Sequence, residues 1–137
     1  MILDTDVIVA TIRSTSGASA EIVRRILRGE LAVEASVAVV LEYEAVATRK
    51  EHLVAGGLTE AEVLVVIDAL AAVAKPVEIH FRWRPQLRDA DDEMVLEAAI
   101  NAADRTIITF NHRDFAGAAG RFDVALATPA QYLESLK

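Results

Sequence analysis

Residues 1–10 read MILDTDVIVA, an apolar run that ends at Asp4 and is followed by a second carboxylate at Asp6. Residues 1–4 predict a short buried strand, and residues 6–13 predict the beginning of a helix. A carboxylate directly after a buried strand requires a partner, because an unpaired buried charge is costly. This stretch leaves three interpretations of the two acids open: helix-capping groups, a nucleophile with its general acid, or a metal site.

The composition is that of a folded chain, with 53% hydrophobic and 26% charged residues. Its 137 residues predict one domain over residues 1–137. The chain has no cysteine, which excludes disulfides, thiolate zinc sites and cysteine nucleophiles and fits a cytoplasmic location. We expect neither a signal peptide nor a membrane span, because no basic start precedes a long apolar run and no run reaches about 18 apolar residues.

The net charge of −7 argues against a broad phosphate-binding surface, because lysine and arginine supply most nonspecific affinity for nucleic acids. Net charge is an average, however, and a bound cation inverts the sign at an acidic site.

Predicted strands and helices alternate along the rest of the chain. Ser36 and Thr59 are expected helix N-caps, the latter in a capping box with Glu62, and Pro129 is expected in the first turn of the last helix. This order predicts a three-layer α/β/α fold with a mainly parallel central sheet. Helices are expected over residues 16–30, 36–57, 58–75, 91–104 and 129–137, strands over 31–36, 77–81, 105–110 and 123–128, and a polar turn over 111–115.

Polar side chains from three segments are expected at one edge of this sheet. Asp4 ends the first strand, and Asn111 and Asp114 follow the strand over 105–110. Ligands of open parallel sheets bind outside the carboxyl ends of the strands. A third group of acids begins the helix over 91–104: Asp89, Asp91, Asp92 and Glu93.

Glu42 adds a fourth segment. Its neighbours three and four positions away on the helix are all apolar, and a carboxylate on such a face requires a partner. Glu44 is the competing candidate, because its neighbours are only slightly more polar. An ion pair with Arg49 is the simpler explanation of Glu42.

Each of the other acids also has a simpler explanation. Asp6 is then an N-cap, Asp91 or Asp92 caps its helix, and Asp114 organises a turn. One shared cause explains the convergence better, since hard divalent cations such as Mg²⁺ or Mn²⁺ hold carboxylate clusters together.

The chain resembles the PIN-domain ribonucleases, in particular toxins of the VapC kind. The matching pieces occur in the family's order and cover almost the whole chain. They are LDTDV (3–7), LEYEAVATR (41–49), LRDADDEMVLEAA (87–99), IITFNHRDF (107–115) and ATPAQYL (127–133).

This resemblance implies a catalytic set of Asp4, Glu42, Asp92 and Asp114. It implies that Asp4, Asp92 and Asp114 bind Mg²⁺ or Mn²⁺, and that Glu42 orients or deprotonates the attacking water. The secondary metal-site candidates are Asp89 and Asn111. Two departures from the family's pattern are Asp6, where Asn or Ser is usual, and Phe110-Asn111, where many members have an acid.

The activity that the resemblance implies is hydrolysis of RNA phosphodiester bonds by the toxin of a toxin–antitoxin pair. It further implies a cognate antitoxin and a homodimer. Arg82, Trp83, Arg84 and Arg113 are the candidates for RNA binding, since arginine with an aromatic ring suits backbone contact and base stacking. Trp83 is alternatively a core or interface residue.

Two other functions remain open. ILDTDV also fits the beginning of a haloacid-dehalogenase-like phosphatase, with Asp4 as nucleophile, Asp6 as general acid and Lys75 as the lysine that neutralises phosphate. Alternatively, the protein is a noncatalytic PIN-like binding module that uses the apolar helices over 21–27 and 63–74.

Overall fold

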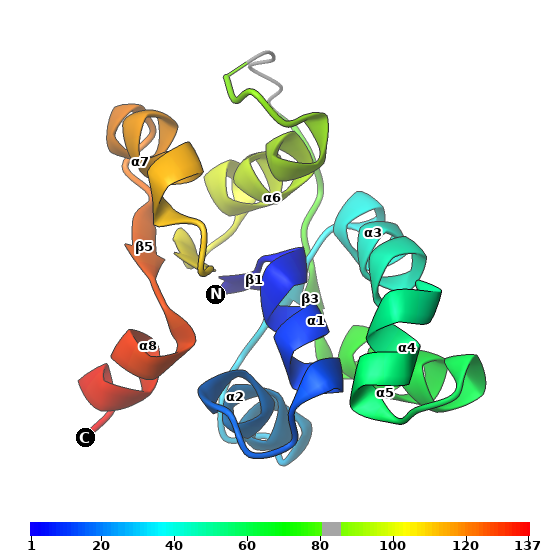
Figure 1. The fold of residues 1–137 in the computed structure, drawn as a ribbon. Helices are drawn as coiled ribbons and strands as arrows, with labels where there is room; N and C mark the ends of the chain where they lie inside the picture. Colours follow the sequence, from blue (N-terminus) through cyan, green and yellow to red (C-terminus); the bar gives the residue numbers. More distant parts are fainter. Residues whose placement is uncertain (81–85) are drawn as a thin grey trace.

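The computed structural model describes residues 1–80 and 86–137. Figure 1 shows the first strand near the middle of the molecule with helices around it, and the last strand at the left edge. The elements alternate along the chain as the sequence predicts. In order they are β1 (Ile2–Leu3), α1 (Thr5–Arg13), α2 (Ala18–Leu27), β2 (Glu34–Ala35), α3 (Val37–Ala47), α4 (Lys50–Gly56), α5 (Glu60–Val73), β3 (Lys75–Pro76), α6 (Ala90–Asn101), β4 (Thr106–Ile108), α7 (His112–Arg121), β5 (Ala125–Ala127) and α8 (Pro129–Ser135).

All strand pairs among the described residues are parallel, and helices pack around them, which confirms the predicted three-layer α/β/α fold. Strands β1, β4 and β5 form one sheet in that order, and β2 pairs with β3. A hydrogen bond from the amide of Glu34 to the carbonyl of Met1 (2.8 Å) joins the two pieces. The carboxyl ends of β1 and β4 therefore lie side by side, at Asp4 and Thr109.

Apolar side chains from both sheet pieces and the surrounding helices form one core. Ile2, Leu3, Ile107 and Ile108 are fully buried on the central strands. Helix α6 packs on β1 and β4, and α7 packs on β5. This packing therefore holds the strands that end at Asp4 and Thr109 in place.

The predicted caps are confirmed. The hydroxyl of Ser36 accepts from the amide of Val39 (3.2 Å), and Thr59 forms the capping box with Glu62. Pro129 stands in the first turn of α8.

The helix predicted over 36–57 is wrong, because the chain forms α3 and α4 with a break between them. The hydroxyl of Thr48 donates to the carbonyl of Glu44 (2.6 Å), and Arg49 has an extended backbone and becomes the N-cap of α4. Such side-chain bonds to the preceding turn compete with regular helix.

The strand predicted over 77–81 is also misplaced, since β3 is Lys75–Pro76 and residue 81 is outside the described residues. The amides of Lys75 and Val77 donate to Val33 and Ala35, so the missing N–H of Pro76 faces away from β2. An edge strand tolerates proline at such a position.

The polar turn predicted over 111–115 is the first turn of helix α7. Phe115, Ala118 and Ala119 are buried, and their spacing is helical. Gly117 and Gly120 lower the helix propensity of this segment, and the prediction of a turn overlooked the apolar stripe.

In the described part of the chain, none of the helices is both long enough and apolar enough to cross a bilayer.

Candidate functional site

Asp4 lies where β1 ends and α1 begins, and it is 5% exposed. Its Oδ1 accepts from the amide of Thr5 (2.7 Å), which makes it the N-cap of α1. Its Oδ2 accepts from the hydroxyl of Thr109 (2.7 Å). Burial raises the pKa of Asp4, and the hydrogen bonds from Thr109 and Thr5 oppose that shift.

Asp6 is not the helix cap that the sequence suggested, because it lies in the first turn of α1 and Asp4 takes the cap. Its Oδ2 accepts from the amide of Phe110 (3.0 Å) and the hydroxyl of Thr109 (3.3 Å). Its Oδ1 is buried and has no hydrogen-bond partner among the described residues. Burial and the charge of Asp4 raise the pKa of Asp6 to about 7.

Asp92 is held beside Asp4 by the first turn of α6. Asp89, rather than Asp91 or Asp92, is the N-cap of that helix, with its Oδ1 accepting from the amide of Asp91 (2.9 Å). Burial first, and then the negative charges of Asp4 and Asp89, raise the pKa of Asp92 to about 7. Asp92 therefore lies among other carboxylates, in surroundings that disfavour its negative charge.

The loop before α6 is fixed by a buried carboxylate. Oε1 of Glu93 accepts the amides of Gln86 (2.5 Å) and Leu87 (2.7 Å), and Arg121 donates to the Gln86 side chain (3.0 Å). These bonds hold the segment that leads into Asp89 and Asp92.

Asn111 connects Asp92 with Asp114. Its side-chain amide donates to Oδ2 of Asp114 (3.1 Å) and, at a long 3.5 Å, to Oδ2 of Asp92. Asp114 is exposed in the first turn of α7. The backbone amide of Asn111 donates to the hydroxyl of Thr109 (2.8 Å). Thr109 therefore contacts both Asp4 and Asn111.

Glu42 faces this group from α3. Burial, followed by the charge of Asp91, raises the pKa of Glu42, whereas the charge of Arg49 lowers it. The suggested ion pair between Glu42 and Arg49 is not formed among the described residues, although the two side chains line the same surface.

One hollow of about 300 Å³ contains most of these groups, and we name it the acidic hollow. Asp89 and Asp114 do not line it, and neither does Lys75 of the phosphatase interpretation, which is exposed on β3. The lining residues are Asp4, Thr5, Asp6, Val9, Glu42, Val46, Arg49, His52, Asp91, Asp92 and Asn111.

A neighbouring hollow of about 270 Å³ contains Asp114 together with Arg113 and Arg88. Arg113 therefore lies next to the predicted site. The other three candidates for RNA binding, Arg82, Trp83 and Arg84, lie outside the described residues.

Sequence reasoning overlooked Thr109 and His52, and it considered Arg49 only as an ion-pair partner of Glu42. Thr109 ends a predicted strand at the edge where ligands bind, and that position was the available signal. No pattern in the sequence indicates that His52 lines the hollow, because it lies on α4, after the break that separates α3 from α4.

The donor set fits a hard divalent cation of the magnesium type. It consists of carboxylate and amide oxygens, and Oδ1 of Asp6 is a buried oxygen with no donor among the described residues. In residues 1–80 and 86–137 no three His, Cys, Asp or Glu side chains stand at metal-binding distance of one another. Magnesium is usually bound by one or two carboxylates and several waters, which this arrangement allows.

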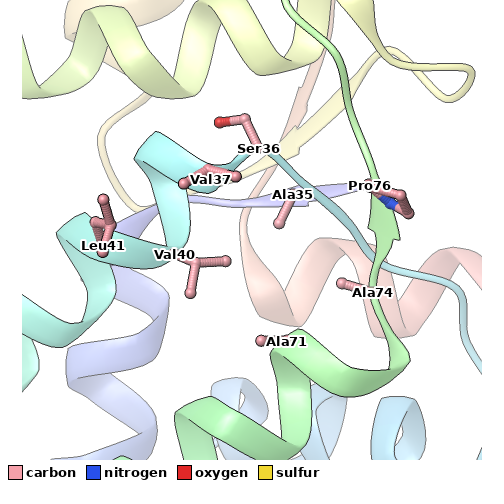
Figure 2. Close-up of a pocket in the computed structure, with 8 residues that line it drawn as sticks. All are labelled: Ala35, Ser36, Val37, Val40, Leu41, Ala71, Ala74 and Pro76. Atoms are coloured by element: carbon pink, nitrogen blue, oxygen red, sulfur yellow. The ribbon is translucent and has the colours of Figure 1, made fainter.

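A third hollow, of about 260 Å³, is apolar and lies away from the acids, between α3, α5 and the β2–β3 pair (Figure 2). We name it the apolar hollow. Two of its side chains are well exposed, Val37 at 77% and Leu41 at 57%. Its residues are Ala35, Ser36, Val37, Val40, Leu41, Ala71, Ala74 and Pro76.

Comparison with known proteins gives one match, to a family model described as a PIN domain, over residues 1–113. That range includes the acids from Asp4 to Asp92 and ends one residue before Asp114. Neither the curated proteins nor the solved structures gave a match.

Proposed function

Since this chain belongs to the PIN-domain family, whose members are typically nucleases that use divalent metal ions, we propose that it is an Mg²⁺- or Mn²⁺-dependent endoribonuclease. The family indicates nuclease-type chemistry on nucleic acid. We propose RNA as the substrate, Mg²⁺ or Mn²⁺ as the metal, and the following roles for the residues.

The observation that supports it is the crowding of carboxylates in the acidic hollow. Asp4, Asp6 and Asp92 all have a raised pKa, and for Asp6 and Asp92 the negative charge of Asp4 contributes to the shift. Such a group holds full negative charge at neutral pH only when a cation lies among its members.

Asp4 and Asp92 would hold the metal ion. Asp114 would bind it directly or through a water, and the side-chain amide of Asn111 connects Asp114 with Asp92. A bound ion supplies acidification of a water and neutralisation of charge on the phosphate oxygens. Glu42 accepts the proton of the attacking water, and its raised pKa makes it a stronger base than an ordinary glutamate. Thr109 keeps the Asp4 carboxylate oriented through its 2.7 Å hydrogen bond.

Arg113 and Arg88 are proposed to bind the substrate backbone beside Asp114, since both line the hollow next to it. Arg82, Trp83 and Arg84 remain sequence-based candidates for the same task.

The test is cleavage of a single-stranded RNA by the purified protein with Mg²⁺, with Mn²⁺ and with EDTA. We expect metal-dependent cleavage that falls at least 100-fold in Asp4→Asn, Asp92→Asn and Glu42→Gln, as general acid–base and metal-ligand losses do. Asp68→Asn, an exposed acid on α5, is the matched control and keeps full activity.

Three results would contradict the proposal. Activity equal in EDTA excludes the metal dependence. Absence of cleavage in every condition favours the noncatalytic module. A phosphoryl group trapped on Asp4 supports the phosphatase mechanism instead.

We further propose that the protein is the toxin of a toxin–antitoxin pair and that residues 1–137 form one domain. The packing of α8 on α2 and β5 supports the single domain. Growth arrest on expression, abolished by Asp92→Asn and by coexpression of a small protein encoded next to this one, tests the toxin role.

A homodimer is proposed at the apolar hollow, because the exposed side chains of Val37 and Leu41 stand beside it on α3 (Figure 2). Light scattering of the purified protein tests this: Leu41→Glu is expected to give monomers, and the exposed Val54→Glu on α4 is the control. A wild-type monomer at high concentration overturns it.

A further inference from the structure

We propose that Arg49 and His52 form a cationic subsite that binds a backbone phosphate of the substrate strand next to the one that is cleaved. The inference rests on the proposed ribonuclease function and adds a binding site on the side of the acidic hollow away from Arg113.

The subsite is placed by the break between α3 and α4. Glu42 and Val46 are four residues apart on α3 and share one face, and Arg49 follows the end of α3 as the N-cap of α4. All three line the hollow. The helix rises roughly 8 Å from Glu42 to Ala47, and Thr48 leads from there to Arg49, so the Arg49 end is separated from the Glu42 end. The two ends are therefore far enough apart to contact different phosphates.

Arg49 is available for an external anion. Its side chain is exposed, and its guanidinium makes no hydrogen bond or ion pair within residues 1–80 and 86–137. It nevertheless stands close enough to Glu42 for its charge to lower the pKa of that carboxyl. A guanidinium with free donors at the rim of a hollow suits bidentate phosphate binding.

His52 is held in place beside it. Nη1 of Arg13 lies 3.1 Å from Nδ1 of His52. Because a guanidinium only donates, Nδ1 is the acceptor and the ring proton of the neutral imidazole is on Nε2. The His52 side chain is 14% exposed, so it is a fixed part of the wall. Its Nε2 lies 3.7 Å from Oε1 of Glu51, an exposed side chain, so a phosphate at this position would replace Glu51 as the acceptor of the Nε2 proton.

Electrostatics favours such a subsite at this acidic surface. The hollow carries five carboxylates, at Asp4, Asp6, Glu42, Asp91 and Asp92, and the whole chain has a net charge of −7. A metal ion would offset the charge only at the Asp4–Asp92 end. A polyanionic strand that leaves this end passes Glu42, and Arg49 is the cation that meets it there.

The experiment measures binding of a fluorescent single-stranded RNA by anisotropy over a range of salt concentrations, in an Asp92→Asn background that prevents cleavage. Arg49→Gln is expected to weaken binding about tenfold, the loss of one charge-assisted contact. It is also expected to reduce the slope of log K against log salt by about 0.7, the value for one phosphate of a single strand. Arg49→Lys is expected to restore the slope.

Lys50→Gln is the matched control. It removes the same charge one residue away from Arg49, and the exposed Lys50 side chain does not line the hollow. We expect less than a twofold change. His52→Gln is expected to weaken binding without altering the slope.

Three results overturn the subsite. If the wild type cleaves RNA but Arg49→Gln and Lys50→Gln bind alike, the subsite alone is wrong. The same holds if Arg49→Gln shifts only the pH profile of cleavage, because Arg49 then acts on Glu42. If the wild type neither binds nor cleaves RNA, the proposed function fails and the subsite fails with it.

Discussion

The hydroxyl of Tyr43 donates to the carbonyl of Leu3 at 2.5 Å, and this buried bond joins helix α3 to the end of β1. Burial raises the pKa of Tyr43, so the phenol stays protonated and remains a donor. Leu3 precedes Asp4, and Tyr43 follows Glu42. This hydrogen bond therefore links the chain next to two proposed catalytic carboxylates that belong to different elements, alongside the packing of α3 on α1.

Tyr43→Phe is expected to lower the free energy of unfolding by about 1–2 kcal/mol, because it leaves a buried carbonyl without this donor. Chemical denaturation measures the change. Tyr132→Phe is the matched control, since the Tyr132 hydroxyl makes no hydrogen bond within the described residues, and it should have little effect. Equal effects of the two variants would show that the Tyr43 bond does not stabilise the fold.

Thr109→Val is expected to impair both stability and RNA cleavage. Valine keeps the β-branched shape but removes the donor to Asp4 and Asp6 and the acceptor for the Asn111 amide. Loss of a buried hydroxyl that has partners costs about 1–3 kcal/mol, and we expect at least tenfold slower cleavage from a misoriented Asp4.

Thr109→Ser retains the hydroxyl and is expected to restore most of the activity. Denaturation and initial cleavage rates measure the two effects. Cleavage by Thr109→Val at the wild-type rate would remove Thr109 from the site.

The sequence predicts the elements whose signals are local. Prediction fails where contacts between residues far apart in the chain determine the role of a side chain. Ser36, Thr59 and Pro129 each mark a helix start through neighbours within three residues, and all three predictions are confirmed. The role of Asp6 depends on the amide of Phe110, which is 104 residues away in the chain. No local pattern contains that contact, so the sequence suggested a helix cap instead.

The same distinction applies to the site. Asp4 and Asp92 are expected at the sheet edge from strand and helix order, and the structure places both in the acidic hollow. Arg49 and His52 reach it because Thr48 and Arg49 interrupt a helix that propensity alone continues to Gly56. The apolar spacing of Phe115, Ala118 and Ala119 was a local signal for α7 and was available in the sequence.

Gly56→Ala is expected to destabilise the protein, because a Cβ at this position would stand 2.2 Å from the carbonyl oxygen of Ile12. Neither atom belongs to a flexible side chain, so α4 has to shift away from α1, at a cost of about 1–3 kcal/mol or more. Urea denaturation measures the loss.

Gly120→Ala is the matched control, because it lies within α7 and a Cβ there meets no atom within 4 Å. Alanine at such a helical position is expected to stabilise the fold by about 0.5–1 kcal/mol. If both substitutions change stability in the same direction, the close approach of Gly56 to Ile12 is not a constraint on the fold.

The metal-free protein is expected to lose stability as the pH rises from about 4 to about 8. The pKa values of Asp6 and Asp92 are raised in the folded state from 3.8 to about 7, so the folded state binds more protons than the unfolded state in this interval. The resulting stabilisation is complete below the unfolded pKa and is lost as the pH passes through the folded pKa. Added Mg²⁺ is expected to restore stability near pH 8, because it binds the ionised carboxylates of the folded state.

Denaturation curves at several pH values, with Mg²⁺ and with EDTA, measure this dependence. Asp6→Asn and Asp92→Asn are each expected to raise the stability near pH 8 in EDTA and to flatten the pH profile. Asp68→Asn controls for the general effect of removing one negative charge from a chain of net charge −7. If Asp68→Asn changes the pH dependence of stability as much as the other two variants do, any surface carboxylate contributes as much. Repulsion within the acidic hollow then does not limit stability.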